Sequence, residues 1–329
     1  MLTDNFGRKH NYLRISLTER CNLRCFYCMP AEGVALSPAE NIMTASEIIT
    51  IAKKFVELGV TKIRLTGGEP MVRKDFLEIV ESLSLLPVSL AITTNGVLID
   101  QYIDLFTNNK IKKINISIDT LDKEKFNNIT RRNYFDRVMN NINSLLQKGI
   151  IPKLNVVLIK GVNDDEIVDF ITLTKNWPVA IQFIEYMPFT GNKWDLSKCV
   201  SMNEILEKVN NYFGAAKTIK LLDEANSTSK NYQIENFLGK FGIVSTVTNP
   251  FCDSCNRIRL TANGRIKNCL FSGGEVNLLQ QLRLGNEMES TIREALNLKK
   301  EKRGGMLDFN SSESAIHIKN NRSMVMIGG

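Results

Sequence analysis

Six of the seven cysteines form two groups of three, and the spacing within each group is suited to metal chemistry. They are Cys21, Cys25 and Cys28 in the stretch CNLRCFYC, and Cys252, Cys255 and Cys269 in CDSCNRIRLTANGRIKNC. Cysteine thiolates bind zinc, copper and iron–sulfur clusters. Since a tetrahedral site takes four ligands, each group leaves one position for something else. The seventh cysteine, Cys199, stands alone and is expected to be a small buried apolar side chain.

Zinc and an iron–sulfur cluster are the two alternatives for each group. Structural zinc normally takes four ligands from nearby pairs, but the two histidines, His10 and His317, are far away in sequence. A zinc site in the second group would need a ligand such as Asp253. A cubane cluster is held by cysteine thiolates, normally four, so three of them leave one iron open. The sequence therefore favours iron–sulfur clusters at both positions.

Strand-like and helix-like segments alternate from residue 12 to about residue 187. The predicted strands are residues 13–18, 62–66, 89–94, 113–119, 153–159 and 180–185. The clearest helix is TASEIITIAKKFVELG, where Thr44 and Glu47 form a capping box and Gly59 ends the helix. This alternation predicts parallel strands with right-handed crossovers. Six units fall short of the eight in a closed barrel, so we expect an α/β fold, an incomplete (β/α)6 barrel.

Several of the predicted strands alternate apolar and polar residues, as in LRISLT, KIRLT, KINIS and KLNVVL. Because strand side chains have a period of two, each of these strands has one apolar and one polar face. The helices between the strands must cover the apolar face, which leaves the polar face to line an interior space. Arg and Lys are rarely buried without a partner, so this space should hold water and an anionic ligand.

After about residue 215 the sequence changes to short β-like segments, with Asn263–Gly264 as a hairpin turn. Helical patterns follow at residues 276–284 and 287–298. We therefore predict two domains. Residues 1–215 form the partial barrel, and residues 216–329 form a C-terminal α+β extension that carries the second cysteine group and ends in Gly328 and Gly329.

Length and composition are those of an ordinary globular protein, with 329 residues, 43% hydrophobic and 23% charged. The net charge of +7 comes from scattered residues rather than a dense basic block, which argues against nucleic acid as a partner. No apolar run is long enough to cross a membrane. The first residues lack the apolar core of a signal peptide, so a cytoplasmic protein is expected.

Three features together resemble the radical S-adenosylmethionine superfamily. CxxxCxxC directly follows the first strand, an aromatic residue, Tyr27, precedes the third cysteine, and TGGEP (residues 66–70) ends the second strand. The second cysteine group is followed by Arg257 and Arg259, and the chain ends in IGG. With these features the whole chain, from about Gly7 onward, is similar to the GTP 3′,8-cyclase family.

The resemblance implies two 4Fe–4S clusters and S-adenosylmethionine as cofactors. It implies that a 5′-deoxyadenosyl radical abstracts the ribose 3′ hydrogen of GTP and that 3′,8-cyclo-7,8-dihydro-GTP forms, the first step of molybdenum cofactor biosynthesis. The implied partners are GTP, a low-potential electron donor, and a downstream enzyme that makes cyclic pyranopterin monophosphate. Neither nucleic acid nor a membrane is a partner, and a homodimer is expected.

The resemblance also assigns roles to residues. The cluster ligands are the six cysteines of the two groups. The residues matching contacts to S-adenosylmethionine are Tyr27, Gly68, Ser117 and Met187. The residues matching contacts to GTP are Arg14, Lys62, Arg64, Thr93, Lys153, Arg257, Ile258 and Arg259. The catalytic residues are Arg257, Arg259, Gly328 and Gly329. One position departs from the family, because Gln182 stands where an arginine is usual, which weakens the expected phosphate contacts there.

Two other functions fit parts of the sequence. One is a radical S-adenosylmethionine enzyme that modifies peptides and carries an auxiliary cluster. The other, from a different class, is a zinc-dependent nucleic-acid-binding module. The arginines after Cys255 and the terminal IGG favour GTP over both.

Overall fold

The computed structural model describes residues 1–30, 32–306, 308–309 and 311–329. Six parallel strands, adjacent in sequence order, form the centre of the sheet. They are β1 (Tyr12–Ser16), β2 (Lys62–Thr66), β3 (Ser89–Thr94), β4 (Lys113–Ser117), β5 (Lys153–Leu158) and β6 (Ala180–Glu185). The predicted α/β class, with an incomplete (β/α)6 barrel, is confirmed.

Strand β1 begins one residue earlier than predicted, at Tyr12, and β5 ends one residue earlier, at Leu158. Two strand ends differ from the prediction by two residues. Strand β1 ends at Ser16 rather than at residue 18, because Thr18 turns away and its carbonyl accepts from the Gly68 amide at 2.7 Å. Strand β4 ends at Ser117 rather than at residue 119, and the Asp119 carboxylate accepts from the Val157 amide at 2.9 Å. In both places the chain leaves the sheet to build the loops of the site.

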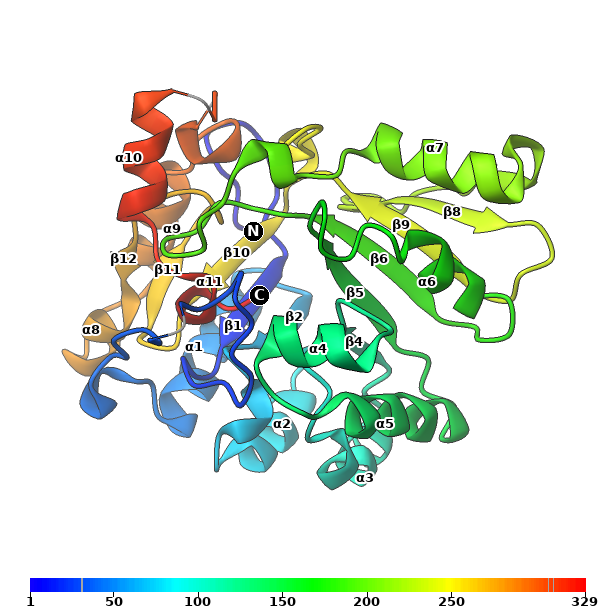
Figure 1. The fold of residues 1–329 in the computed structure, drawn as a ribbon. Coiled ribbons are helices and arrows are strands. Elements are labelled where there is room, and N and C mark those ends of the chain that lie inside the picture. The colour runs from blue at the N-terminus through cyan, green and yellow to red at the C-terminus, as the bar shows by residue number, and fades with distance from the viewer. Residues whose placement is uncertain (31, 307, 310) are drawn as a thin grey trace.

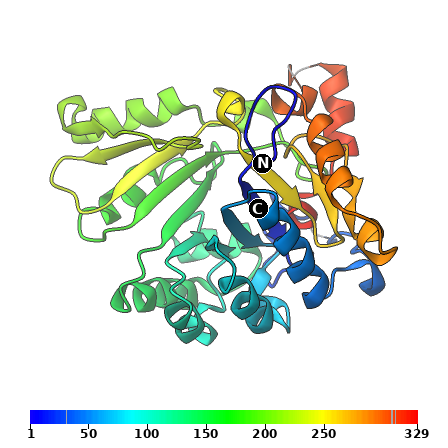
Figure 2. The same ribbon diagram turned by 180° about the vertical axis from the view of Figure 1, so that it is seen from behind.

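Helices cover the outer side of these strands (Figures 1 and 2). They are α1 (Ala45–Glu57), α2 (Phe76–Ser84), α3 (Ile103–Asn108), α4 (Lys123–Thr130), α5 (Phe135–Gln147) and α6 (Ile167–Leu173). The predicted capping box of α1 is confirmed, since the Thr44 hydroxyl accepts from the Glu47 amide and the Glu47 carboxylate accepts from the Thr44 amide. Gly59 follows the helix with φ +99°, as a stop requires. None of the described helices is long and apolar enough to cross a membrane.

The two faces of the strands are segregated as the alternation predicts. Leu13, Ile15, Ile63 and Leu65 are fully buried in the core beneath the helices. The intervening polar residues line an interior cavity instead. The hydrophobic effect thus directs the apolar face to the helices and leaves the charged face of each strand for a ligand.

The C-terminal part of the chain extends the same sheet at both edges, so that the described residues form twelve strands. Strand β10 (Arg257–Leu260) pairs in parallel with β1, and β9 (Lys240–Val244) pairs in parallel with β6. The remaining strands and α-helices are β7 (Thr218–Lys220), β8 (Lys230–Ile234), β11 (Arg265–Lys267), β12 (Val276–Asn277), α7 (Met202–Phe213), α8 (Leu278–Arg283), α9 (Glu289–Asn297), α10 (Ser312–Asn320) and α11 (Met324–Ile327). The hairpin predicted at Gly264 is confirmed between β10 and β11. A domain boundary at residue 215 stays a prediction.

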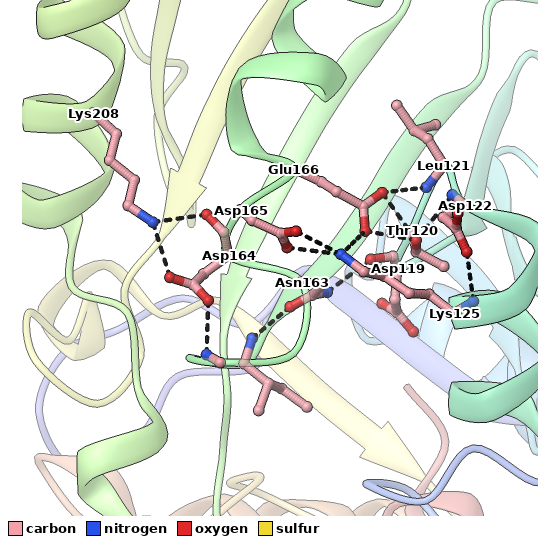
Figure 3. A network of polar contacts seen from close by, with 12 residues as sticks. Asp119, Thr120, Leu121, Asp122, Lys125, Asn163, Asp164, Asp165, Glu166 and Lys208 are labelled. Atoms are coloured by element: carbon pink, nitrogen blue, oxygen red, sulfur yellow. Dashed lines mark hydrogen bonds and ion pairs between the residues drawn. The ribbon is translucent and has the colours of Figure 1, made fainter.

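A polar network holds together the loops that follow β4 and β5 (Figure 3). Lys125 on α4 forms ion pairs with Asp165 at 2.7 Å and with Glu166 at 3.1 Å. The buried Glu166 carboxylate also accepts from the Thr120 hydroxyl at 2.7 Å. These contacts fix the segment that carries Asp119, next to Thr120, at the edge of the cavity.

Candidate active site

A cavity of about 680 Å³ lies on the polar side of the sheet. This volume is in the range of small-molecule sites. Its lining includes all six grouped cysteines, namely Cys21, Cys25, Cys28, Cys252, Cys255 and Cys269. The structure therefore joins two motifs that are more than 200 residues apart in sequence into one site.

The two cysteine groups lie at opposite ends of this cavity. The first group follows the C-terminal end of β1, whereas Cys252 and Cys255 precede the N-terminal end of β10. Because β1 and β10 are parallel neighbours, these are opposite ends of the sheet. Cys269 follows the antiparallel strand β11 and therefore returns to the same end as Cys255. Strands of this length separate the two ends by roughly 15 Å.

The loop of the first cysteine group is tied to the end of α4. The Arg24 amide donates to the Thr130 carbonyl at 2.9 Å, and the Arg24 guanidinium donates to the Cys21 carbonyl at 2.6 Å. Burial, with the charge of Glu69, raises the pKa of Cys21 to about 11. Burial also raises the pKa of Cys25 and of Cys28 well above the ordinary value.

Three thiols with raised pKa values would become thiolates only beside a positive centre, which the irons of a cluster supply. The donor set thus fits a cubane with one open iron. No three cysteine, histidine, aspartate or glutamate side chains among the described residues are grouped closely enough to bind a single metal ion.

The buried Asp119 carboxylate, just beyond β4, holds the first cysteine loop in place. The Tyr27 hydroxyl donates to Asp119 Oδ2 at 2.7 Å, and Asp119 Oδ1 accepts from the Val157 amide. Burial outweighs these two bonds and raises the pKa of Asp119 to about 6. Asp119 was not among the predicted site residues, although it lies two residues beyond Ser117 at the end of the same predicted strand.

The TGGEP turn brings its backbone against the first cysteine loop. The Gly68 amide donates to the Thr18 carbonyl, and the Glu69 amide donates to the Arg20 carbonyl at 2.8 Å. A Cβ atom on Gly68 would lie 2.4 Å from the Arg20 carbonyl oxygen. Only glycine fits here. The four residues predicted to contact S-adenosylmethionine, Tyr27, Gly68, Ser117 and Met187, all line the cavity.

The second cysteine group is supported by residues outside the predicted set. The buried Lys299 donates to Cys255 Sγ at 3.5 Å and to the Arg257 carbonyl at 3.1 Å. The Arg303 amide donates to Cys252 Sγ at 3.4 Å. Burial raises the pKa of Cys252. Burial also acts to raise the pKa of Cys255, but the nearby Lys299 and Arg257 outweigh it and bring that pKa below the ordinary value. Three thiols with two donors to their sulfurs are a chemically suitable site for a second cluster.

Five cations and one tyrosine form two rows across three neighbouring strands between the cysteine groups. The strand register places Arg257, Tyr12 and Lys62 in one row and Arg259, Arg14 and Arg64 in the next. All six line the cavity. Two buried nitrogens of this group, Arg14 Nε and Arg257 Nη1, have no hydrogen-bond partner among the described residues.

Crowding of these cations perturbs their titration. Burial and the neighbouring charge of Arg257 lower the pKa of Arg259 to about 10. On β5, burial and the charges of Arg64, Lys240 and Lys62 lower the pKa of Lys153 to about 8. Because cations without counterions repel one another, a polyanion would relieve this crowding.

Two predicted residues lie differently from the others. Ile258 is fully buried in the core on the other face of β10, so its side chain does not reach the cavity. Gly329 lines the cavity, whereas Gly328 lies just outside the lining and its carbonyl accepts from Arg259 at 2.8 Å. A Cβ atom on Gly328, which has φ +88°, would lie 2.5 Å from Thr66 Oγ1. The end of the chain is thus packed between β1 and β2.

Three further residues singled out from the sequence have well-defined positions in the structure. Thr93 lines the cavity and its hydroxyl accepts from Arg64 at 3.1 Å. Gln182 lines the cavity on β6, between Asn155 and Gly242 in register. Cys199 is buried and donates to the Tyr186 carbonyl, as expected of a lone core cysteine.

Comparison with known proteins gives consistent results. The family model of the radical SAM superfamily matches residues 15–174, and that of Molybdenum Cofactor Synthesis C matches residues 179–304. The mitochondrial GTP 3′,8-cyclase of Arabidopsis thaliana is 45% identical over 100% of this chain and 84% of that protein. Molybdenum cofactor biosynthesis protein 1 of Bos taurus is 44% identical over 99% of this chain, which spans about half (51%) of that relative.

Among solved structures, Streptococcus suis SuiB bound to S-adenosylmethionine is similar, with a TM-score of 0.61 and 18% identity over 87% of this chain and 68% of that one. At this identity the likeness concerns the fold alone. The family assignment rests instead on the relatives that match this chain over its full length. The chain belongs to the GTP 3′,8-cyclase family of the radical S-adenosylmethionine superfamily.

Proposed function

We propose that this protein converts GTP to 3′,8-cyclo-7,8-dihydro-GTP, the first step of molybdenum cofactor biosynthesis. The observation that supports this most is one cavity with a cysteine triad at each end and rows of cations between them. A nucleoside triphosphate carries about four negative charges. Each cation about 4 Å from one of these charges contributes on the order of 4 kcal/mol at an effective dielectric near 20, before desolvation is subtracted.

The first triad, Cys21, Cys25 and Cys28, would hold the cluster that binds S-adenosylmethionine. When bound, these groups supply a 5′-deoxyadenosyl radical, which removes a hydrogen atom from the substrate. The chain's own residues then have two tasks: Tyr27 and Gly68 position S-adenosylmethionine, and the cation rows hold the triphosphate. GTP held between the two ends of the cavity would have its ribose near the first triad and its base near the second.

The second triad, Cys252, Cys255 and Cys269, would hold a further 4Fe–4S cluster at the guanine end. Arg257 and Arg259 lie on β10 just beyond this triad and line the cavity among the cations that would bind the phosphates. Together with Gly328 and Gly329, they are the residues that we assign to turnover. This also predicts about eight irons per chain after anaerobic purification.

The proposed reaction requires further partners. A low-potential donor must reduce the first cluster, and a downstream enzyme must convert the cyclic nucleotide to cyclic pyranopterin monophosphate. We place the protein in the cytoplasm, where cysteines stay reduced, and propose a homodimer.

The test is to incubate the reduced protein with S-adenosylmethionine and GTP and to identify the nucleotide product by mass spectrometry. We expect 5′-deoxyadenosine and the cyclised nucleotide in comparable amounts. Deoxyadenosine without a cyclised nucleotide would reject GTP as the substrate, and modification of an added peptide instead would favour the peptide-modifying alternative. A colourless protein containing zinc would support the binding-module alternative.

Gln182→Arg should lower the dissociation constant of GTP. Gln182 has a buried side chain in the cavity wall, and arginine there adds a charge and two forked donors for phosphate. We expect a decrease of roughly threefold to tenfold, measured by equilibrium binding of GTP to the anaerobic holoprotein. Gln101→Arg, which adds the same charge at an exposed position, should leave binding unchanged. An unchanged or higher constant for the Gln182 variant would show that this position does not contact phosphate.

Affinity for GTP should fall as the pH rises through about 8, the pKa of Lys153 before GTP binds. Lysine is charged below its pKa, and phosphate favours the charged form, so binding is strongest below this value. Replacing Lys153 with arginine should reduce the dependence, because guanidinium stays charged throughout this range. Titrations of GTP at several pH values would decide this. The same slope in both proteins would exclude Lys153 from the phosphate site.

A further inference from the structure

Tyr12 occupies the one position in the two cation rows that is not arginine or lysine. On β1 it pairs in register with Lys62 of β2 on one side and with Arg257 of β10 on the other. Neighbouring strands lie about 4.8 Å apart, so Tyr12 separates two cations whose backbones are about 10 Å apart. Its side chain is only 7% exposed and lines the cavity.

The aromatic ring of Tyr12 contacts both of these cations. Lys62 Nζ lies 4.5 Å from the ring centroid, and the Arg257 guanidinium carbon lies 5.5 Å from it. At such distances the electron-rich faces of an aromatic ring attract cations. The ring thus helps to stabilise two like charges that lie near enough to repel one another.

The phenol oxygen of Tyr12 fixes a third cation. Arg64 donates from Nε to this oxygen at 2.6 Å, and from Nη1 to the Ile92 carbonyl at 2.9 Å and to Thr93 Oγ1 at 3.1 Å. These bonds hold the guanidinium plane in one orientation. The remaining atom, Nη2, has no hydrogen-bond partner among the residues that the structure describes, and it is free to donate to a ligand.

We propose that Tyr12 is a positioning residue that holds Lys62, Arg64 and Arg257 ready for the phosphates of the nucleotide. This inference rests on the proposed function, because it assumes that a nucleoside triphosphate occupies the cavity. Binding is tighter when the charged groups of the site are already oriented, since less order is lost when the ligand arrives. Tyr12 therefore acts through the three cations and affects the phosphate end of the substrate rather than its base.

The electrostatics of the site agree with this role. Although burial opposes it, the charges of Arg14, Arg64 and Lys62 together with the Arg64 hydrogen bond lower the pKa of Tyr12 to about 7. The surrounding cations therefore favour the ionised form of the phenol. A phenylalanine would keep the ring but remove the oxygen, and a leucine would remove both.

The experiment measures dissociation constants of GTP, GDP, GMP and guanosine for the anaerobic holoprotein and its Tyr12 variants. Tyr12→Phe should weaken the binding of GTP by about tenfold, since the substitution removes a hydrogen bond to a charged group. Tyr12→Leu should weaken the binding of GTP by a further threefold to tenfold, since both cation–π contacts are lost as well. The loss should shrink with each phosphate removed, and guanosine should bind equally well to all three proteins.

Tyr232→Phe is the matched control. Lys220 lies 5.2 Å from the Tyr232 ring centroid, so this tyrosine also carries a cation. It is not among the described residues that line the cavity, and its variant should bind GTP like the parent protein.

Three outcomes would overturn the inference. They are unchanged GTP binding by Tyr12→Phe, an equal loss of affinity for guanosine and GTP, and an equal loss of GTP affinity in the Tyr232→Phe control. Failure of the proposed function is distinguishable, because the parent protein itself would then not bind GTP. Binding of S-adenosylmethionine by each variant shows that the fold is intact.

Discussion

Cys252→Ser should abolish the cyclised nucleotide while S-adenosylmethionine cleavage continues. Cys252 belongs to the triad at the N-terminal end of β10, whereas Cys21, Cys25 and Cys28 lie at the opposite end of the sheet. Losing one of three thiolates should release the second cluster and leave about four irons per chain. Product formation should fall by at least about a hundredfold, since changes to groups that only support a metal ligand already cost up to this much.

Iron analysis, deoxyadenosine yield and nucleotide yield, all from the same sample, check this prediction. Cys199→Ser is the control, because Cys199 is buried but belongs to neither triad, and its Sγ donates to the Tyr186 carbonyl. Normal product from Cys252→Ser would remove the second triad from the reaction. Loss of deoxyadenosine as well would mean that the two ends of the cavity do not act separately.

Gly68→Ala should disable the opposite end of the site. The new Cβ atom would lie 2.4 Å from the Arg20 carbonyl oxygen and 2.7 Å from its carbon. Arg20 directly precedes Cys21, so the clash must displace the start of the first cysteine loop. Such overpacking costs about 1–3 kcal/mol of stability. We expect S-adenosylmethionine cleavage to fall by at least about a hundredfold, because the displaced backbone is also the surface that approaches the ligand.

Gly274→Ala is suited as the comparison for this variant. Gly274 is exposed, and the nearest atom to an added Cβ is Ser272 Oγ at an ordinary 3.7 Å. Its cleavage rate and melting temperature should match those of the parent. If Gly68→Ala cleaves S-adenosylmethionine at the parent rate, close packing of the TGGEP turn against the cysteine loop is not required.

The parts of the fold and site that local sequence pattern determines were predictable. Alternation in strands such as KIRLT places Lys62 and Arg64 on the face opposite Ile63, whatever the neighbouring strands are. Thr44 and Glu47 cap a helix through bonds within four residues. For the same reason the cysteine spacings identified both triads before any fold was known.

What depends on pairing between distant segments was not predictable. The C-terminal strands extend the central sheet, where β10 pairs with β1 and β9 with β6. Neither pairing leaves a local pattern, and the register of β1 with β10 is what places Tyr12 beside Arg257. Lys299 meets Cys255 only because α9 ends beside β10. A signal for Tyr12 did exist, since it lies two residues before Arg14 and therefore on the same strand face.

GTP carrying deuterium at the ribose 3′ position tests the central claim most directly, namely that the substrate lies between the two triads with its ribose toward the first. The reduced holoprotein is incubated with this GTP and S-adenosylmethionine, and the 5′-deoxyadenosine is analysed by mass spectrometry. The proposed arrangement predicts that the deoxyadenosine gains deuterium. Unlabelled deoxyadenosine formed together with a nucleotide product that retains the deuterium would contradict it.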